Sequence, residues 1–345
     1  MNHPPVVLGL DFGGTKIAAA VCDLAGTRLA STVVDSLATD GARASFDHGV
    51  DTARDLLASS APGARLAAVG VSTFGIPFDD RVDLAPAIDG WESFPLGREL
   101  RAAFAGTLVE VATDAKAAAL AETRWGSLAG CNPAVYLNLG TGLAAAVVIA
   151  GQVVSGSHGA AGEIGYNLRS SLDVGLGLDH RVTLEDVVSG QALPKRAAAL
   201  GLAGAGGAQL TAADVFQASE DDPAADDLIS AFVTELAFHL VNIAILVDPV
   251  RIAVGGGLAR SAHRILPTLE RALRAAVPFP PELVVAHFPD DAPLMGAIAI
   301  AVDAVTGISR RQPVLASDIP GPDGQAGSDT STDNSHNATC TLNLA

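Results

Sequence analysis

The chain has 345 residues, 49% of them hydrophobic, and a formal net charge of −17, because 38 Asp and Glu outnumber 21 Lys and Arg. This length allows two domains, each with its own core. The acidic balance argues against a nucleic-acid-binding surface, which needs clustered Lys and Arg. We expect no association with a membrane, because no apolar run reaches the length of a spanning helix and the N-terminus lacks a signal-peptide pattern.

The cysteines indicate a reducing compartment. Cys22, Cys131 and Cys340 lie far apart in the sequence and form no CxxC pair. This spacing is not typical of a disulfide scaffold, and we expect a cytoplasmic protein.

Hydrophobic periodicity predicts strands and helices that alternate along the chain, which indicates an α/β fold. Strands are expected at Leu8–Leu10, Ile17–Val21, Ala67–Val71, Thr107–Ala112, Val135–Leu139, Leu143–Ile149 and Arg251–Val254. Helices are expected at Arg43–Ala58, Ala115–Trp125, Leu184–Leu200, Asp221–Val247 and Ser261–Ala276. Residues 312–345 are rich in Gly, Ser, Thr, Asp and Asn, a composition typical of a disordered tail.

Two segments, Val7–Ser31 and Ala134–Ser157, repeat one pattern: an apolar strand, a Gly/Thr turn, a strand with Ala-Ala-Ala-Val, and a further glycine turn. Such a repeat indicates two related halves. Glycines permit positive φ and let backbone N–H groups approach an anion closely. We therefore predict that the two turns hold a polyphosphate from opposite sides.

The first turn, Asp11-Phe-Gly-Gly-Thr-Lys16, combines groups suited to a nucleotide. Asp11 is suited to hold Mg²⁺ through water, while the amides of Gly13 and Gly14, with Thr15 or Lys16, are suited to phosphate oxygens. The alternative is a tight hairpin in which the glycines serve geometry alone.

Two further glycine clusters extend this prediction. Gly140, Thr141 and Gly142 form the second turn and are expected to bind phosphate. Gly255, Gly256 and Gly257 follow a predicted buried strand and precede a helix, a place suited to the flat face of an adenosine.

These residues belong to motifs that resemble the ROK family of sugar kinases, repressors and related proteins, within the actin-like ATPase superfamily. The resemblance covers residues 6–305, through DFGGTK at 11–16, TDAKAAALAE at 113–122, LGTG at 139–142, HGAAGEIGY at 158–166, LEDVVSG at 184–190 and DPVRIAVGGG at 248–257. It implies two actin-like (ribonuclease H-like) domains flanking a nucleotide cleft, ATP and Mg²⁺ as cofactors, and transfer of the γ-phosphoryl group to a primary hydroxyl.

By the same resemblance we place the domains at residues 1–112 and 113–311, with the last helix, about 295–308, packing back on the first domain. A homodimer is the family's habit and is also expected.

The resemblance implies that Asp114 is the catalytic base, which takes the proton of the acceptor hydroxyl. From the residues alone, capping of the following helix by Thr113 or Asp114 is the alternative. Glu163 and Glu185 match carboxylates that accept hydrogen bonds from substrate hydroxyls. The alternatives are a solvated or ion-paired Glu163 and a first-turn helix charge at Glu185.

Several positions depart from the family pattern. Thr113 stands where the family has Asn, Tyr166 stands where it has His, and Gly75 is retained near the acceptor. Lys116 replaces a frequent asparagine, and we expect it to be an ordinary solvated lysine. Tyr166 and Thr113 therefore suggest an altered acceptor.

The zinc motif of the family is also missing. Its cysteine positions fall at Leu176, Leu178 and Thr183, so we predict no structural zinc. The loop Leu168–Arg181 is instead expected to be held by apolar packing, through Leu172, Leu176 and Leu178.

These features predict a kinase acting on a sugar-like polyol, with a C7-cyclitol of the valiolone type as the preferred interpretation. A carbocycle has no hemiacetal hydroxyl for a histidine to recognise, and a changed polar site shifts specificity strongly. The alternatives are a hexose or amino-hexose kinase (glucose, kanosamine) and a non-catalytic sugar sensor.

Overall fold

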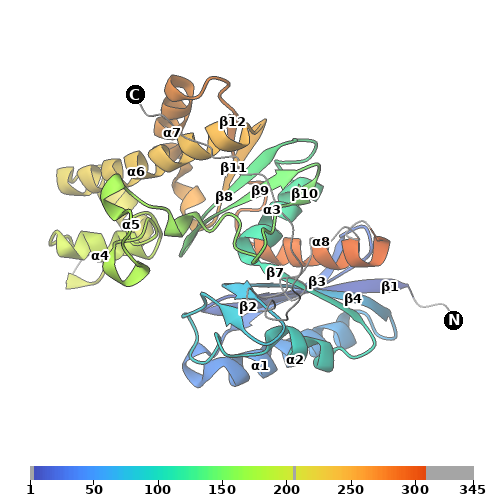
Figure 1. Cartoon of the computed structure of the whole chain (residues 1–345). Helices are drawn as coiled ribbons and strands as arrows, with labels where there is room; N and C mark the ends of the chain where they lie inside the picture. The colour runs from blue at the N-terminus through green and yellow to red at the C-terminus, as the bar shows by residue number, and fades with distance from the viewer. Residues whose placement is uncertain (1–3, 205–206, 308–345) are drawn as a thin grey trace, which may run out of the picture.

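The computed structural model describes residues 4–204 and 207–307, and the tail predicted at 312–345 lies outside this range. The chain forms two lobes, each built on a five-stranded mixed sheet (Figure 1). The expectation of an α/β protein is therefore confirmed.

The first sheet has the order β3-β2-β1-β4-β7. Its strands are β1 (Pro5–Phe12), β2 (Lys16–Cys22), β3 (Arg28–Asp35), β4 (Arg65–Thr73) and β7 (Leu108–Thr113). The β1–β2 and β2–β3 pairs are antiparallel, whereas β1–β4 and β4–β7 are parallel. Strand β3 was not predicted from the sequence, because it lies at the edge and buries little of its surface.

The second sheet repeats this topology in the order β10-β9-β8-β11-β12. Its strands are β8 (Ala134–Leu139), β9 (Leu143–Ile149), β10 (Gln152–Val153), β11 (Arg251–Gly255) and β12 (Glu282–Val285). Here too the first three strands pair antiparallel and the last two join in parallel. The two halves predicted from the repeated turns are thus confirmed by the strand order.

Helices α1 (Gly41–Ser60) and α2 (Leu96–Ala103) cover one face of the first sheet (Figure 1). Between them and the strands lies an aromatic cluster in which Trp91, fully buried, stacks on Phe74 and Phe94. The short strands β5 (Ile76–Pro77) and β6 (Val82–Asp83) form a hairpin beside this core.

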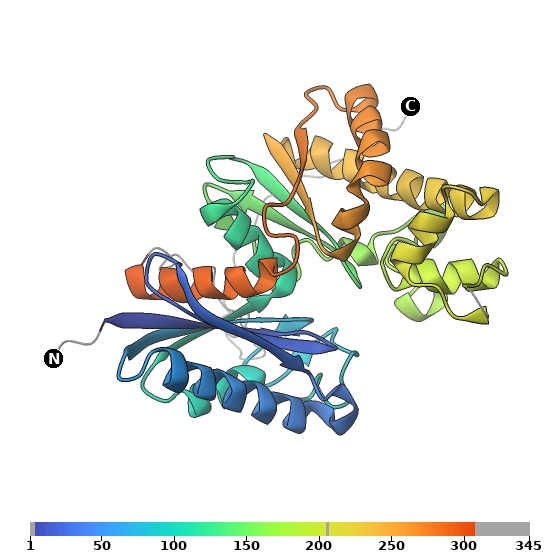
Figure 2. The same ribbon diagram turned by 180° about the vertical axis from the view of Figure 1, so that it is seen from behind.

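The other face of the first sheet is covered by α8 (Ala292–Thr306), from the end of the described chain (Figure 2). Glycines permit this close contact: a Cβ on Gly70 would lie 1.8 Å from the Ala297 carbonyl oxygen, and one on Gly296 would lie 1.9 Å from that of Ala117. Ala117 belongs to α3 (Asp114–Trp125), so α8 is held between the first sheet and α3.

The second lobe places α3 on one face of its sheet and α6 (Pro223–Val247) with α7 (Ala262–Ala276) on the other. The remaining helices are α4 (Ala192–Ala199) and α5 (Ala212–Ala218). Short 3₁₀ turns are η1 (Ala38–Asp40), η2 (Ile164–Tyr166), η3 (Ser171–Asp173), η4 (Leu178–His180) and η6 (Gly257–Ser261).

Helix α6 corrects the expectation that no apolar run reaches the length of a spanning helix. By length and composition, it is apolar enough to cross a membrane. Half of its most apolar window is buried inside the lobe, as in the core helix of a soluble protein.

The helix predicted at Leu184–Leu200 is shorter than expected, because only α4 is α-helical. The N–H groups of Gly190 and Gln191 donate to the carbonyl oxygens of Gly140 and Thr141, at 2.8 and 3.1 Å. Because these two N–H groups bond to the second glycine turn, the α-helix begins only after Gln191.

The predicted apolar packing of the loop Leu168–Arg181 is wrong. Leu172 is 84% exposed, and Leu176 and Leu178 are also exposed. The loop is held by polar contacts: Arg181 donates to the carbonyl oxygen of Tyr166 at 2.6 Å, and Arg169 bonds Glu235 of α6 at 2.8 Å.

Candidate active site

The first glycine turn joins β1 to β2. Its Gly13 N–H donates to the Lys16 carbonyl oxygen at 2.9 Å, and the Ser36 hydroxyl donates to that of Gly14 at 3.0 Å. Within residues 4–204 and 207–307, the N–H groups of Gly14 and Thr15 donate to no protein acceptor. The turn is thus fixed by Gly13 and leaves two amides available, with exposed Thr15 and Lys16 side chains beside them.

The second turn repeats this arrangement between β8 and β9. The Gly140 N–H closes it by donating to the Gly142 carbonyl oxygen at 3.1 Å. The N–H groups of Thr141 and Gly142 have no acceptor in the part of the chain that the structure describes. None of the turn glycines has positive φ, contrary to expectation.

Gly13 and Gly142 are instead required because other atoms lie close to their Cα atoms. A Cβ on Gly13 would lie 2.9 Å from the Lys16 carbonyl oxygen, and one on Gly142 would lie 2.6 Å from Glu185 Oε2.

The third cluster lies against the second turn. Gly256 has a φ of 83°, and a Cβ there would lie 2.6 Å from the Leu139 carbonyl. Gly255 pairs with Asn138 in the parallel register of β11 and β8. Gly257 is exposed, and a Cβ on it would meet nothing within 4 Å. Gly257 therefore presents open backbone surface, whereas Gly255 is buried and a Cβ on it would lie 2.1 Å from the Tyr136 hydroxyl oxygen.

Asp11 lies at the end of β1, where its Oδ1 accepts a 2.6 Å hydrogen bond from the Ser72 hydroxyl of β4. Burial raises the pKa of Asp11 to about 7; the Ser72 hydrogen bond opposes the rise, and the Asp114 charge adds to it. We did not identify Ser72 from the sequence, although a hydroxyl in the apolar run of β4, in register with Asp11, was a usable signal.

Asp114 is the first residue of α3. The Thr113 hydroxyl caps this helix by accepting from the Lys116 N–H at 3.4 Å, so the capping alternative is confirmed for Thr113. Asp114 Oδ1 accepts from the Ala115 N–H at 2.6 Å. Burial raises the pKa of Asp114; the Ala115 N–H and the Lys116 charge oppose this effect, while Glu185 adds to it.

Lys116 is not the solvated lysine that we expected. It is 6% exposed, and its Nζ lies 3.7 Å from Glu163 Oε1 and 3.5 Å from Thr113 Oγ1. Burial lowers the pKa of Lys116, and Glu163 and Asp114 oppose this. A buried ammonium needs such partners, and the sequence pattern could not show that α3 turns this position inward.

Glu185 connects the second turn to the same group. Its Oε2 accepts from the Leu143 N–H at 2.7 Å. Burial raises the pKa values of both Glu163 and Glu185. The charge of Asp114 raises the pKa values of Asp11 and Glu163, and the charge of Glu185 raises that of Asp114, so these four predicted carboxylates are linked electrostatically.

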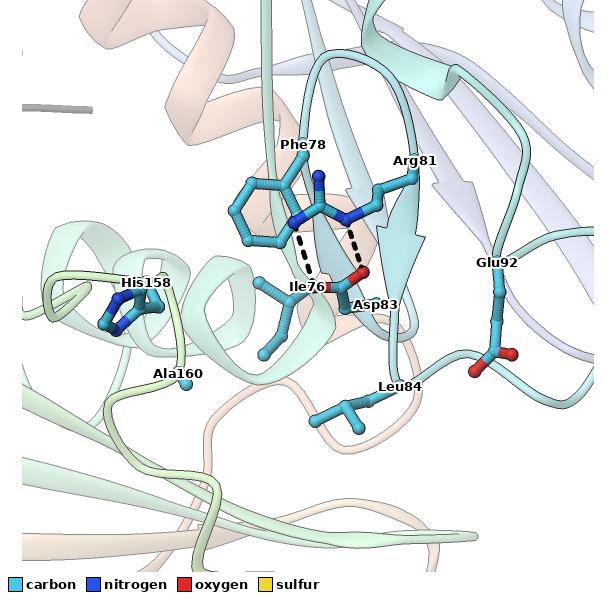
Figure 3. Close-up of a pocket in the computed structure, with 8 residues that line it drawn as sticks. All are labelled: Ile76, Phe78, Arg81, Asp83, Leu84, Glu92, His158 and Ala160. Atoms are coloured by element: carbon cyan, nitrogen blue, oxygen red, sulfur yellow. Dashed lines mark hydrogen bonds and ion pairs between the residues drawn. The ribbon is translucent and has the colours of Figure 1, made fainter. Parts of the chain in front are cut away.

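A pocket of about 580 Å³ lies between the segment that carries Ile76 to Leu84 and the loop that carries His158 and Ala160 (Figure 3). It is lined by Ile76, Phe78, Arg81, Asp83, Leu84, Glu92, His158 and Ala160. The figure shows the loop with His158 and Ala160 facing the segment with Ile76, Phe78 and Leu84. Burial raises the pKa of Tyr166, as do the charges of Glu185, Glu163 and the pocket residue Glu92.

Gly75 lies against the backbone of Asp83, one of the residues that line this pocket. It has a φ of 76°, and a Cβ would lie 2.6 Å from that of Ala85. The volume is in the range of small-molecule sites. Sequence reasoning gave no role to Glu92 or to the Arg81–Asp83 pair, because no local motif marks them. His158 opens the HGAAGEIGY motif, which was the available signal for that residue.

The donor set suits a nucleotide with magnesium. Among the described residues, no group of three or more His, Cys, Asp and Glu side chains could hold a metal ion. Mg²⁺ is commonly held by one or two carboxylates together with water and phosphate oxygens. Asp11 can supply the carboxylate, and the free amides at the turns can hold the phosphate oxygens. The buried Asp11 carboxyl, which has no basic partner among the described residues, is consistent with a cation there.

Comparison with known proteins identifies the family. The model of the ROK family matches residues 7–304, nearly the whole chain. The chain belongs to the ROK family. Its topology accordingly is that of the actin-like ATPase fold, with two mixed sheets.

This ROK protein is similar to several kinases. It is 29% identical over 292 residues to a glucokinase of Streptomyces coelicolor, covering 78% of this chain and 87% of that protein. It is 30% identical over 277 residues to a kanosamine kinase of Amycolatopsis mediterranei, covering 77% and 84%. With the Brucella suis bifunctional enzyme NanE/NanK it shares 32% identity over 209 residues, which are 60% of this chain and 37% of that enzyme.

Solved structures agree. A ROK hexokinase from Thermus thermophilus has a TM-score of 0.72 at 30% identity, covering 88% of this chain and 99% of its own. A ROK glucokinase from Streptomyces griseus, solved with glucose and AMPPNP, has a TM-score of 0.68 at 30% identity, covering 86% and 99%. These relatives are phosphotransferases with an alcohol acceptor, which confirms the expectation of an enzyme.

Proposed function

We propose that this ROK protein is an ATP-dependent kinase that transfers the γ-phosphoryl group to the primary hydroxyl of a sugar-like polyol. The observation that carries the proposal is the position of Asp114, which interacts with Asp11 beside one glycine turn and with Glu185 beside the other. We propose that this base acts between the groups suited to phosphate and those suited to hydroxyls. The kinase names of the relatives support the same reaction.

In the proposed reaction, Asp114 accepts the proton of the acceptor hydroxyl as the new O–P bond forms. The positive end of the α3 dipole favours its ionised form, as does Lys116. Glu163 and Glu185 accept hydrogen bonds from other hydroxyls and orient the acceptor for in-line attack.

The nucleotide is proposed to bind along the three glycine clusters. The amides of Gly14, Thr15, Thr141 and Gly142 would take phosphate oxygens, and Gly255–Gly257 would face the adenosine. Asp11 would hold Mg²⁺ through water, and the ion would supply charge neutralisation for the phosphates. The surfaces of both lobes then exclude water that would otherwise hydrolyse ATP.

We further propose a C7-cyclitol of the valiolone type as the acceptor. Thr113 and Tyr166 replace the residues usual in hexose-binding relatives, while Asp114, Glu163 and Glu185 are kept. The pocket lined by Glu92 and His158 has a volume of about 580 Å³, which is large enough for a single ring (Figure 3). Glucose and kanosamine are the alternatives, favoured by the names of two relatives. We also propose a cytoplasmic protein that binds neither nucleic acid nor membrane.

The test measures ATP consumption by the purified full chain with Mg²⁺ and a panel of hexoses, amino sugars and cyclitols. The proposal expects turnover with at least one polyol, and valiolone with the highest kcat/KM. If glucose has the highest value, the cyclitol is wrong and the kinase stands. Tight binding of a sugar without ATP consumption on any of them would overturn the kinase and favour a non-catalytic sensor.

A further inference from the structure

Lys116 is a buried cation among the carboxylates of the site. Its side chain is 7% exposed, and that of its ion-pair partner Glu163 is 25% exposed. The Nζ atom lies 3.7 Å from Glu163 Oε1 and 3.5 Å from Thr113 Oγ1. Lys116 thus touches two of the side chains proposed to surround the acceptor and follows Asp114 by two residues.

The charge of the site depends on this residue. Asp114, Glu163 and Glu185 would together form a strongly negative pocket that attracts a cationic ligand. No other Lys or Arg in residues 4–204 and 207–307 forms an ion pair with Glu163. Because like charges a few ångströms apart repel strongly inside a protein, an ammonium group bound at Glu163 would meet Lys116.

Glu163 keeps its ability to accept hydrogen bonds in this ion pair. A carboxylate has about four lone-pair sites, and one ammonium contact leaves the others for hydroxyl donors. The pair therefore favours a neutral polyol hydroxyl at Glu163 and opposes a positively charged amine there.

We propose that Lys116 determines acceptor specificity: its ion pair with Glu163 makes the site select neutral polyols over acceptors that carry an ammonium group. The proposal rests on the kinase function and narrows its acceptor, because it opposes amino-hexoses such as kanosamine.

The experiment compares kcat/KM for glucose and for kanosamine, which differ in one hydroxyl replaced by an amine, in the wild-type chain and in variants. In the wild-type chain we expect a glucose-to-kanosamine ratio of at least tenfold. Lys116→Met keeps the length of the side chain and removes its charge, and should lower this ratio at least tenfold. Lys116→Arg keeps the charge and should retain the wild-type preference.

Glu163→Gln provides a test in the opposite direction. It removes the negative charge and leaves Lys116, so the ratio should rise even as turnover of both sugars falls. A loss of stability alone would lower both activities together and leave the ratio unchanged. If Lys116→Met does not fold, the rise of the ratio in Glu163→Gln decides the question.

The outcomes separate the two proposals. No turnover of any polyol by the wild-type chain overturns the kinase function. Turnover with a wild-type ratio near one, or a ratio unchanged in both Lys116→Met and Glu163→Gln, overturns only the role of Lys116.

Discussion

The carboxylate of Glu185 accepts a 2.7 Å hydrogen bond from the Leu143 N–H, the first residue after the second glycine turn. This bond joins an acceptor carboxylate to a turn suited to phosphate. Glu185 Oε2 also lies 2.6 Å from the position of a Cβ on Gly142, so a larger residue there would displace the carboxylate. The two proposed binding regions are therefore coupled by contact.

Gly142→Ala is expected to displace Glu185 and lower kcat/KM for the polyol more than tenfold, or about 1.4 kcal/mol. The backbone of Gly142 does not have positive φ, so the effect comes from the Cβ contact. Steady-state kinetics measure it. Gly177→Ala, at an exposed position where the nearest atom lies 3.9 Å away, is the matched control and should keep wild-type kinetics.

Asp114→Asn should reduce kcat by roughly 10²- to 10⁴-fold, the usual contribution of a general base. The amide keeps the shape of the side chain and can still accept from the Ala115 N–H. ATP affinity, measured by calorimetry, should change little. A variant with wild-type kcat would show that another group takes the proton.

In buffer without nucleotide and Mg²⁺, the pH dependence of folding stability should include a contribution from the titration of Asp11. Its pKa is about 7 in the folded state against 3.8 ordinarily, so between these values the folded state binds more protons than the unfolded state. The contribution of Asp11 to stability therefore falls as pH rises from about 4 to 7.

Asp11→Asn removes this titration. The Tm of the variant should match that of the wild-type chain near pH 4 and exceed it by at least ~2 °C at pH 7.5. Parallel Tm curves for the two proteins across this range would contradict the shifted pKa.

Breaking the ion pair between Arg124 of α3 and Asp303 of α8 on one side only should strongly lower the free energy of unfolding. Asp303 is 4% exposed and accepts two hydrogen bonds, at 2.7 and 3.2 Å. Arg124→Met would leave a buried carboxylate unpaired, which costs about 3–5 kcal/mol.

The double variant Arg124→Met/Asp303→Leu should recover most of that loss, since replacing both charges by apolar groups is often neutral. Denaturant unfolding of the single and double variants measures the difference. Equal losses in both would mean that packing, and not the unpaired charge, sets the cost.

Much of the fold could be predicted from local pattern. The strands around both glycine turns, α1, α3, α6 and α7 lie within a few residues of their predicted ranges. The repeated turns also predicted two related halves, which the matching strand orders confirm. The domain division at residues 112 and 113 and the homodimer stay predictions.

The errors share a physical cause, which is long-range contact. Leu172 and Leu178 suggested an apolar loop, but both side chains are exposed. Gly190, which was predicted to be helical, instead donates its N–H to the carbonyl oxygen of Gly140, 50 residues earlier in the sequence. Lys116 is turned inward toward Glu163, a partner that no local pattern could show.

The position of α8 on the first sheet has a consequence for synthesis. About 180 residues separate the end of β7 from the start of α8, so a ribosome working at its usual rate needs on the order of ten to forty seconds to supply the missing cover. During that interval the nascent chain exposes the apolar surface around Val7 and Ala68. The first sheet can reach its final packing only after α8 has been synthesised, and until then its uncovered apolar face is available to chaperones.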